Sequence, residues 1–323
     1  MMPFCNFYFV SIFFILFFTF MTFIAYIKYS GNIDKILWIE NSQTLKLKEF
    51  HVSKNQEKRI NQLQLFCLSK PKIDLLKFIR SRENKGHFYV SHEKKLLYCS
   101  VPKIASTNWK RVVLLLEGKI KSLTENAKDT VHTIPQTRLF SLISKGEVNH
   151  VLKNYLKFFI TRHPFERLVS AYRNKFADNN TYFERLFGVP ILRMHRTNLT
   201  NTEYESGKGV TFNEFVHWLI ERNVFDAHWA PVYSLCSPCI IPFDFIGKME
   251  TLLEDSEEIL SMIGAKNIHF PANLTDGYKI SSKKLMYDLF STISGDTIQK
   301  LYKMYEADFV AFDYKIPEKL FYN

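Results

Sequence analysis

The chain opens with its most apolar stretch. From Phe4 to Ile27 no side chain carries a charge, and nine of these 24 residues are Phe. A helix rises 1.5 Å per residue, so this run would be about 36 Å long, enough to span roughly 30 Å of hydrocarbon. A cleaved signal peptide fits less well, because the apolar run is long and no A-x-A-like site follows it. We therefore predict a single transmembrane anchor over residues 1–28.

The pattern changes after the anchor. Residues 29–85 are polar and Lys-rich, with scattered Leu and no period typical of a helix or a strand. We expect this segment to be a stem that leads to a folded domain over residues 86–323. The first positive side chain, Lys28, comes after the apolar run, and the positive-inside rule alone would place the rest of the chain in the cytoplasm. Three N-x-[ST] sequons, at Asn179, Asn198 and Asn273, instead favour a glycosylated, lumenal domain.

The folded domain begins with two short apolar runs. Residues 87–91 and 95–101 predict strands joined by the polar turn 92–94. A loop of small residues follows at 102–111, and then the apolar run Val112–Leu116 predicts a helix. The order is therefore strand, loop, helix.

The loop between this strand and helix has the composition of an anion site. Backbone N–H groups and the positive end of a helix dipole converge at such a turn, and Lys103, Ser106 and Thr107 add side-chain donors. The Walker pattern G-x-x-x-x-G-K-[ST] is absent, which disfavours a nucleoside triphosphatase. Taken alone, this segment also fits an ordinary helix start with a solvated lysine.

A second turn of the same kind follows. Residues 155–161 predict a strand that ends at Arg162, and Pro164 suits the first position of a helix over 165–175. Arg162 at the strand tip and Ser170 in the helix could converge on a second phosphate. Two anion sites on neighbouring parallel strands fit a ligand with phosphates at both ends, although a surface helix with solvated arginines is the alternative.

Composition and charge narrow the possible partners. The chain has 323 residues, of which 46% are apolar, so global disorder is excluded. Its net charge of +11 favours anionic partners. Residues 86–196 hold 19 basic and 8 acidic side chains, whereas residues 197–323 hold 11 and 18. An anion site should therefore lie mainly in the middle third.

Four cysteines lie outside the apolar segment: Cys67, Cys99, Cys236 and Cys239. They allow three disulfide pairings in an oxidising compartment. The Cys236-x-x-Cys239 pair could instead be half of a zinc site, but no second Cys/His pair stands at zinc-finger spacing. We favour structural disulfides and expect no metal.

The two turns together, in this order, resemble the nucleotide-binding motifs of the Golgi carbohydrate sulfotransferases, the family of the chondroitin 4-O- and HNK-1-type enzymes. The resemblance extends from about residue 86 to the C-terminus. It lies in five blocks, 98–116, 158–176, 228–239, 243–260 and 301–314.

The resemblance implies an α/β fold with a P-loop-like parallel sheet flanked by helices, and 3′-phosphoadenosine 5′-phosphosulfate (PAPS) as the sulfuryl donor. The family usually has Cys where this chain has Ser106, and an acid where it has His163. By motif position, the 5′-phosphosulfate would be held by Lys103, Ser106, Thr107, Asn108 and Trp109, and the 3′-phosphate by Arg162 and Ser170.

Sulfuryl transfer needs charge neutralisation on the leaving phosphate and a base for the acceptor hydroxyl. Lys103 is the candidate for the first role, so that no metal is demanded. For the base we favour His132, in a polar segment past the first helix, because an unperturbed imidazole titrates near mildly acidic pH. His228 is the second candidate and Glu166 the third.

The acceptor site is predicted from charge alone. Arg193 and Arg196, with Arg185 and His195, form a basic cluster that could bind an anionic glycan. A solvated charged loop is the alternative.

The acidic C-terminal third is predicted to be scaffold. Thr211-x-x-Glu214 and Thr251-x-x-Glu254 have the spacing of capping boxes. Four aromatic residues at helical spacing are expected in the core rather than on sugar platforms: Tyr302, Tyr305, Phe309 and Phe312.

The combined interpretation is a type II, single-pass Golgi membrane enzyme. It would transfer a sulfuryl group from PAPS to a sugar hydroxyl of a glycosaminoglycan, with chondroitin 4-O-sulfation of N-acetylgalactosamine the first choice. The alternative is an inactive, membrane-tethered glycan-binding protein with the same fold. A nucleic-acid partner is disfavoured, because the anchor and the sequons put the basic surface in the wrong compartment.

Overall fold

The computed structural model describes residues 53–71, 87–124, 130–133, 145–272 and 280–320. The chain divides into two compact units, residues 1–53 and 54–323, and the described helices and strands belong to the second. The predicted anchor, residues 1–28, lies outside the described residues. Among the described helices, none combines the length and the apolar character needed to cross a membrane.

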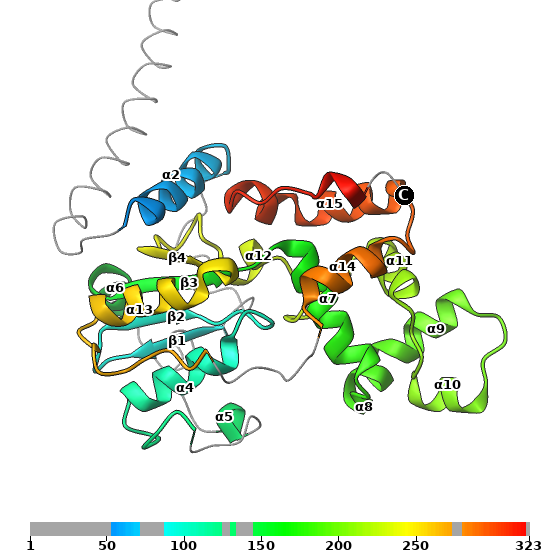
Figure 1. Cartoon of the computed structure of the whole chain (residues 1–323), viewed down its shortest axis with the longest axis horizontal. Helices are drawn as coiled ribbons and strands as arrows, with labels where there is room; N and C mark the ends of the chain where they lie inside the picture. Colours follow the sequence, from blue (N-terminus) through cyan, green and yellow to red (C-terminus); the bar gives the residue numbers. More distant parts are fainter. Residues whose placement is uncertain (1–52, 72–86, 125–129, 134–144, 273–279, 321–323) are drawn as a thin grey trace, which may run out of the picture. The chain divides into compact units, whose positions relative to one another are not determined.

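A four-stranded sheet forms one part of this unit, and a helical region lies beside it (Figure 1). The strands lie in the order β1-β2-β3-β4; β1 pairs antiparallel with β2, whereas β2, β3 and β4 are parallel. The sheet is thus mixed, and the prediction of a parallel sheet holds for three of its strands. The strands are β1 (Phe88–Ser91), β2 (Leu96–Cys99), β3 (Leu156–Thr161) and β4 (Phe245–Lys248).

Helices cover both faces of the sheet, as its burial pattern requires. All six residues of β3 are buried, and successive side chains of a strand point to opposite faces. Phe158 lies 4.5 Å, between ring centroids, from Trp109 of α4, whereas Phe159 lies 5.5 Å from Phe312 at the end of α15. Figure 1 shows α4 on one side of the sheet and α2 and α15 on the other.

Helices make up most of the rest of the described chain. They are α2 (Lys54–Leu68), α4 (Ser106–Leu116), α5 (Thr130–Thr133), α6 (Lys145–Asn154), α7 (Pro164–Tyr172), α8 (Thr181–Phe183), α9 (Val189–His195), α10 (Asn201–Ser206), α11 (Phe212–Arg222), α12 (Val232–Cys236), α13 (Leu252–Met262), α14 (Ser282–Phe290) and α15 (Gly295–Ala311), with π-helical segments η1 (Arg173–Ala177) and η2 (Glu184–Gly188) and 3₁₀ turns η3 (Met249–Thr251) and η4 (Glu318–Leu320).

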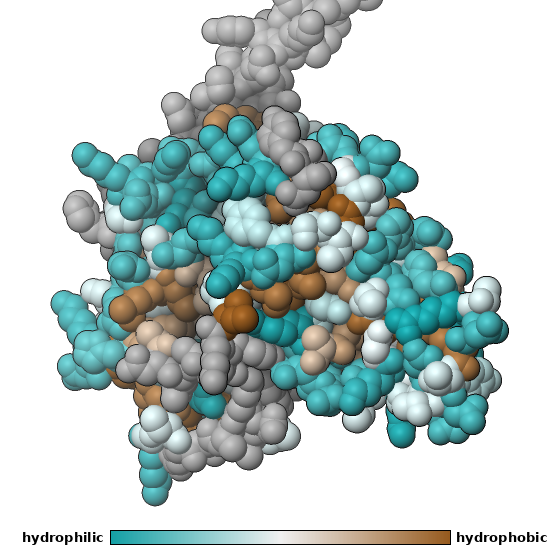
Figure 2. All heavy atoms as spheres, turned by 45° about the vertical axis from the view of Figure 1, so that its right-hand side comes forward, coloured by the Kyte–Doolittle hydropathy of each residue, from teal (hydrophilic) through white to brown (hydrophobic). Residues whose placement is uncertain are grey.

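A second hydrophobic core joins the helices beside the sheet. It packs α7 against α9, α11, α14 and α15 around the buried rings of Phe165, Phe215 and Trp229. Tyr305, Phe309 and Phe312 are buried and Tyr302 packs against this core, so their prediction as core residues is confirmed. Figure 2 shows that hydrophilic residues cover much of one face of the molecule, with apolar residues gathered in a band across its middle.

Helix α2 lies in the segment predicted to be a stem and is part of the folded unit. It contacts the edge strand β4, where Gln56 Oε1 accepts the Ile246 N–H at 3.0 Å and Arg59 donates to the Ile246 carbonyl at 2.9 Å. A disulfide from Cys67 to Cys239 fixes its far end. The side chains of α2 therefore satisfy backbone groups that an edge strand would otherwise expose.

The second disulfide joins Cys99 to Cys236. The two cysteines of the C-x-x-C pair thus bond to two different elements, at the end of β2 and at the end of α2. Structural disulfides were predicted, and the structure selects one of the three pairings.

Two local predictions need correction. Thr211 and Glu214 do form a capping box, but Thr251 does not cap α13: its hydroxyl donates to Asp255 Oδ2 at 2.7 Å. The α-helix expected over residues 165–175 ends at Tyr172 and continues as the π-helical segment η1.

Candidate functional site

The two predicted turns meet at one edge of the sheet. Because β2 and β3 are parallel neighbours, their carboxyl ends lie at the same edge. The Arg162 guanidinium, at the tip of β3, donates through Nη1 to the Lys103 carbonyl oxygen at 3.0 Å. The expectation that both turns belong to one site therefore agrees with the geometry.

The loop after β2 has an unusual backbone. Lys103 and Ala105 have φ values of 70° and 51°, the left-handed region that residues with a Cβ adopt at a cost of order 1–3 kcal/mol. Ala105 is the N-cap of α4 and supplies no side-chain acceptor to its first turn. A helix start without a side-chain cap, reached by a strained loop, is a site that suits an anion.

The predicted donor-binding residues of α4 divide into two groups. Ser106 lies in the first turn, at the loop, together with Thr107. Asn108 points elsewhere: its Nδ2 donates to the Pro271 carbonyl at 3.0 Å, and its Oδ1 accepts from Arg111 at 3.1 Å. The Asn108 side chain thus ties the loop to the segment after α13.

Trp109 is a core residue in this structure. Its side chain is fully buried, and its ring lies 5.8 Å from Tyr98, 4.5 Å from Phe158 and 5.4 Å from Phe270. Its backbone N–H donates to the Ala105 carbonyl. The indole therefore packs in the core beside the loop, and its Nε1–H is buried without a hydrogen-bond partner among the described residues.

Arg162 lies in a poorly solvated place. Its side chain is 12% exposed, Glu166 Oε2 lies 3.8 Å from its Nη2, and its Nε is buried without a hydrogen-bond partner among the described residues. Burial lowers the pKa of Arg162 from its ordinary value, and Glu166 opposes that shift. Ser170 is buried two turns into α7. A buried cation with an unused donor is suited to bind a phosphate.

Arg167, in the first half of α7, is a residue of this region to which the sequence analysis assigned no role. Its guanidinium is buried and donates to three carbonyls: Pro102 at 3.0 Å, Ala227 at 2.8 Å and Ala230 at 2.5 Å. Burial lowers its pKa to about 10, a value at which it still carries its charge at neutral pH. Arg167 thus joins the end of β2 to the segment before α12.

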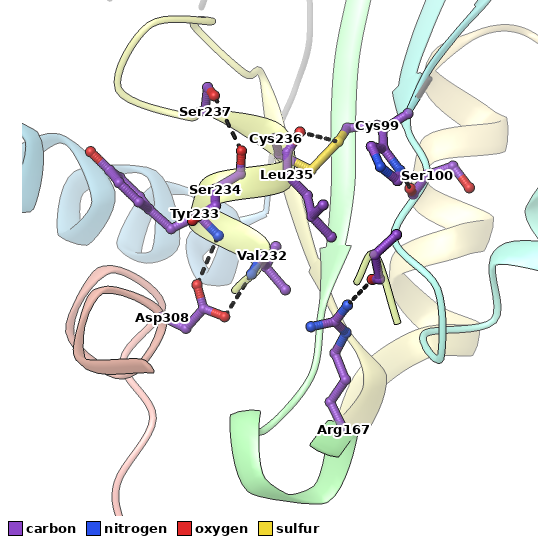
Figure 3. The surroundings of a disulfide bond; sticks show 12 residues. Cys99, Ser100, Arg167, Val232, Tyr233, Ser234, Leu235, Cys236, Ser237 and Asp308 are labelled. Atoms are coloured by element: carbon purple, nitrogen blue, oxygen red, sulfur yellow. Dashed lines mark hydrogen bonds between the residues drawn. A yellow bond between two sulfur atoms is a disulfide. The ribbon is translucent and has the colours of Figure 1, made fainter. Parts of the chain in front are cut away.

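The segment that Arg167 holds is also fixed by an aspartate. Asp308, on α15, accepts from the backbone N–H groups of Val232 and Tyr233, both at 2.7 Å (Figure 3). The Cys99–Cys236 disulfide lies at the other end of the same short helix. Burial raises the pKa of Asp308 to about 6, while the two N–H bonds oppose that shift.

His228 lies within this held segment, and Asp226 is its partner. The Nδ1 atom of His228 lies 2.5 Å from Asp226 Oδ1, which also accepts the His228 backbone N–H at 2.9 Å. The imidazole is 26% exposed. Burial lowers the pKa of His228, Asp226 opposes the shift, and the charges of Lys175 and Lys103 add to it.

His132, the first candidate for the base, lies in the short helix α5, and its side chain is outside the described residues. Helix α5 contacts α4, and its Val131 is buried against Leu114 and Ile120. The role of His132 therefore stays a prediction.

The two predicted acceptor-binding arginines differ in their surroundings. Arg196 donates to Glu203, Glu214 and the Gly209 carbonyl, which occupies four of its five N–H groups. These bonds make it a link between α9, α10 and α11. Arg193 is exposed and stacks on Tyr204, 4.4 Å from the ring centroid.

A pocket of ≈ 340 Å³ lies beside the start of α7. Its lining has both signs of charge, from Glu166 and Glu250 and from Lys283 and Lys315. Glu166 also lies 3.8 Å from Arg162, so the pocket adjoins the predicted 3′-phosphate site.

Comparison with known proteins identifies the family of the chain. Residues 86–315 match the model of the "Sulfotransferase family". The chain belongs to the sulfotransferase family. It is 39% identical over 246 residues to carbohydrate sulfotransferase 11 of Mus musculus, which covers 72% of this chain and 68% of that relative. It is also 36% identical over 239 residues to carbohydrate sulfotransferase 8 of Homo sapiens, covering 72% of this chain and 56% of that protein.

A third relative, carbohydrate sulfotransferase 9 of Homo sapiens, is 33% identical over 276 residues, covering 81% of this chain and 60% of that protein. No solved structure matches the chain significantly. The resemblance derived from the two turns is thus confirmed, and the chain is a sulfotransferase by family. The family implies PAPS as the sulfuryl donor.

The described residues fit such a donor at the β2–α4 and β3–α7 turns. The uncapped start of α4 beside Lys103 would receive one anionic group, and Arg162, with its buried Nε unpartnered among the residues described, would receive another. Within the same part of the chain, no group of three or more His, Cys, Asp or Glu side chains is arranged to hold a metal.

Proposed function

We propose that this sulfotransferase is a carbohydrate sulfotransferase that uses PAPS to sulfate a sugar hydroxyl of a glycosaminoglycan. The observation that carries the proposal is the 3.0 Å bond from Arg162 to the Lys103 carbonyl, which brings two anion-binding turns together at one sheet edge. The relatives named carbohydrate sulfotransferases support a carbohydrate acceptor, and chondroitin 4-O-sulfation is our first choice of reaction.

Lys103 would neutralise the charge that develops on the 5′-phosphate as the sulfuryl group departs. Ser106 and Thr107 would add neutral donors at the same end, and Arg162 with Ser170 would hold the 3′-phosphate at the other. Positioning and electrostatics therefore account for most of the rate enhancement that these residues can supply. His132 was the first candidate from the sequence for the base that accepts the proton of the acceptor hydroxyl, because an unperturbed imidazole titrates near mildly acidic pH.

The acceptor site is proposed from exposed cations. Of the two arginines predicted to bind the acceptor, Arg193 is the one that we keep, because it is exposed. Its planar guanidinium suits carboxylates and sulfates. Arg196 is committed to two glutamates, and we expect it to act by holding α9, α10 and α11 in place.

We also propose that the chain is a type II Golgi membrane protein with a lumenal catalytic unit. The uncharged run from Phe4 to Ile27 supports the anchor. The two disulfides support an oxidising compartment. Asn179 and Asn198 are exposed, as glycosylation of their sequons requires, and Asn273 lies outside the described residues.

The test is a transfer assay with the full chain in detergent. Radiolabelled PAPS is offered with desulfated chondroitin, dermatan and heparan chains, and the position of the incorporated sulfate is read by disaccharide analysis. We expect labelling of chondroitin at the 4-position of N-acetylgalactosamine. Labelling of another glycan would keep the enzyme class and change the acceptor, whereas donor binding without transfer to any chain would favour the inactive binding protein.

Two variants test the donor site directly. Lys103→Ala and Arg162→Ala each remove a charge-assisted contact and should weaken binding of adenosine 3′,5′-bisphosphate about 10- to 100-fold, as measured by calorimetry. Lys121→Ala, at an exposed position after α4, is the matched control and should leave the affinity unchanged. Unchanged affinity in both site variants would contradict the proposed function.

A further inference from the structure

His228 and Asp226 have the geometry of a proton-accepting pair. A carboxylate only accepts hydrogen bonds, so the 2.5 Å contact puts the imidazole proton on Nδ1 and leaves the lone pair on Nε2. The second bond, from the His228 backbone N–H to the same oxygen, helps to fix the orientation of the carboxylate. An imidazole with a fixed tautomer and 26% exposure can take a proton from a bound hydroxyl.

This pair is held at a fixed position beside the donor loop. Arg167 bonds the carbonyls of Ala227 and Ala230, on either side of His228, and the same guanidinium bonds Pro102, the residue before Lys103. Loss of the Arg167 side chain would leave the buried Ala230 carbonyl and the partly buried Pro102 and Ala227 carbonyls without this donor, so the arrangement is costly to disturb. One buried arginine therefore sets the position of the imidazole relative to the loop that would bind the sulfuryl end of the donor.

The charges around His228 favour its neutral, proton-accepting form. Lys175 of η1 and Lys103 of the donor loop both lower its pKa, in addition to burial, and Asp226 opposes them. The positive charge of the buried Arg167, on α7, also interacts with the negative charge of Asp226. Phe183 packs its ring edge-on to the imidazole at 5.1 Å, and the Lys175 ammonium lies 4.0 Å from the centroid of that same Phe183 ring.

We propose that His228, oriented by Asp226, is the general base that accepts the proton of the acceptor hydroxyl. As the hydroxyl oxygen forms its bond to sulfur, Nε2 takes the proton and the imidazole becomes a cation beside Asp226. The bond between sulfur and the bridging oxygen of the 5′-phosphate breaks, and its electron pair leaves on adenosine 3′,5′-bisphosphate, where Lys103 offsets the charge. The assignment rests on the proposed function and names His228 in place of His132.

The first test separates the two histidines. His228→Ala, His228→Gln and His132→Ala are compared in the full chain by kcat on the preferred glycan and by calorimetric affinity for adenosine 3′,5′-bisphosphate. We expect both His228 variants to lose about 10²–10⁴-fold in kcat while donor affinity stays within about twofold, because general-base catalysis contributes that much and His228 does not hold the donor. Glutamine fills the site without a basic nitrogen, so it controls for packing.

Two results would overturn the assignment. One is a kcat within a few-fold of wild type in the His228 variants. The other is loss of donor affinity in His228→Gln, since that would place the imidazole at the nucleotide instead of the acceptor. A wild-type chain that binds the bisphosphate but sulfates no acceptor would overturn the proposed function together with the base.

The pH dependence of kcat distinguishes a general base from a histidine that has only a structural role. The base must be neutral, so the wild-type kcat should fall on the acid side, below the lowered pKa of His228. Lys175→Gln removes one of the charges that lower this pKa, and we expect the acid limb to move to higher pH. Lys153→Gln, on the exposed side of α6, should leave the limb in place. An acid limb that is the same in Lys175→Gln and wild type would contradict the proposal.

Discussion

His163 lies at the start of α7, where the resemblance to the family implied an acid. It is the N-cap of α7: its Nδ1 accepts the Glu166 backbone N–H at 3.4 Å, while Nε2 lies 3.0 Å from the Lys315 carbonyl. Both contacts need the neutral ring with its proton on Nε2. Burial lowers the pKa of His163, the Lys315 carbonyl opposes the shift, and the charge of Arg162 adds to it.

The residue-scale prediction concerns the pH dependence of stability. Because the folded-state pKa of His163 lies below the unfolded value of 6.5, its contribution is fully present above pH 6.5 and is lost as the pH falls through the folded-state value. His163→Ala should cost about 1–2 kcal/mol in the free energy of unfolding at pH 7.5. The difference should shrink toward pH 5, as measured by urea denaturation. A difference that is constant from pH 7.5 to pH 5 would show that the ring does not cap the helix as a neutral acceptor.

Sequence analysis identified the residues whose neighbours along the chain already indicate their role. Lys103 and Arg162 each follow a strand and precede a helix, and the two turns taken together indicate an anion site. Arg167 has no such signal, because its three carbonyl partners lie 60 to 65 residues away in sequence. Its place on one helical face with Ser170, Arg173 and Asn174 does not say that it is buried or which carbonyls it bonds.

At the scale of elements, the edge strand β4 depends on α2. Arg59 bonds the Ile246 carbonyl, Asp255 at 2.8 Å and the Thr251 hydroxyl at 2.9 Å, and the Asp255 side chain is only 7% exposed. The parallel pairing of β3 with β4 is accompanied by a second buried ion pair, in which Lys157 Nζ lies 2.6 Å from Asp244. Sequence analysis did not predict β4, because Phe245–Lys248 is four residues long and contains Gly and Lys, which gives neither alternation nor a long apolar run.

The element-scale prediction uses two neighbouring cations of α2. Arg59→Leu leaves the buried Asp255 carboxylate without its cation and should reduce the free energy of unfolding by about 3–5 kcal/mol. Lys58→Leu is the matched control: its ammonium is 78% exposed and lies 3.7 Å from Asp313, so its loss should cost no more than about 1 kcal/mol. Chemical denaturation of both variants tests this. Equal losses for Arg59 and Lys58 would mean that α2 does not stabilise the edge of the sheet.

At the scale of the whole molecule, the catalytic unit begins earlier than the family match does. The match starts at residue 86, whereas the compact unit starts at Lys54 and includes α2. The sequence of α2 carries little indication of this, because the helix is mostly polar and buries only Gln56 and Leu63. Its attachment depends on hydrogen bonds and on a disulfide with a sequence separation of 172 residues, neither of which has a local pattern.

Truncation tests this boundary. We expect residues 54–323 to fold with the same thermal midpoint as residues 29–323, as measured by circular dichroism. Residues 86–323 lack the partners of Ile246 and Asp255 and the disulfide of Cys239, which alone is worth about 2–5 kcal/mol in a small domain. This shorter fragment should be unfolded or rapidly digested by protease. A fragment 86–323 that melts at the same temperature would show that α2 is dispensable.

The pairing of the cysteines has a consequence for how the protein must be made. Both bridges end on the same tetrapeptide, Cys236–Cys239, and one of them starts at Cys99, four residues before Lys103. A host that keeps thiols reduced would produce a polypeptide in which α2 and the strand before the Lys103 loop lack their disulfides. Random oxidation of these four cysteines afterwards could form any of three pairings, two of which are wrong. Recombinant enzyme should therefore be produced by secretion, with isomerases present to reshuffle early bonds.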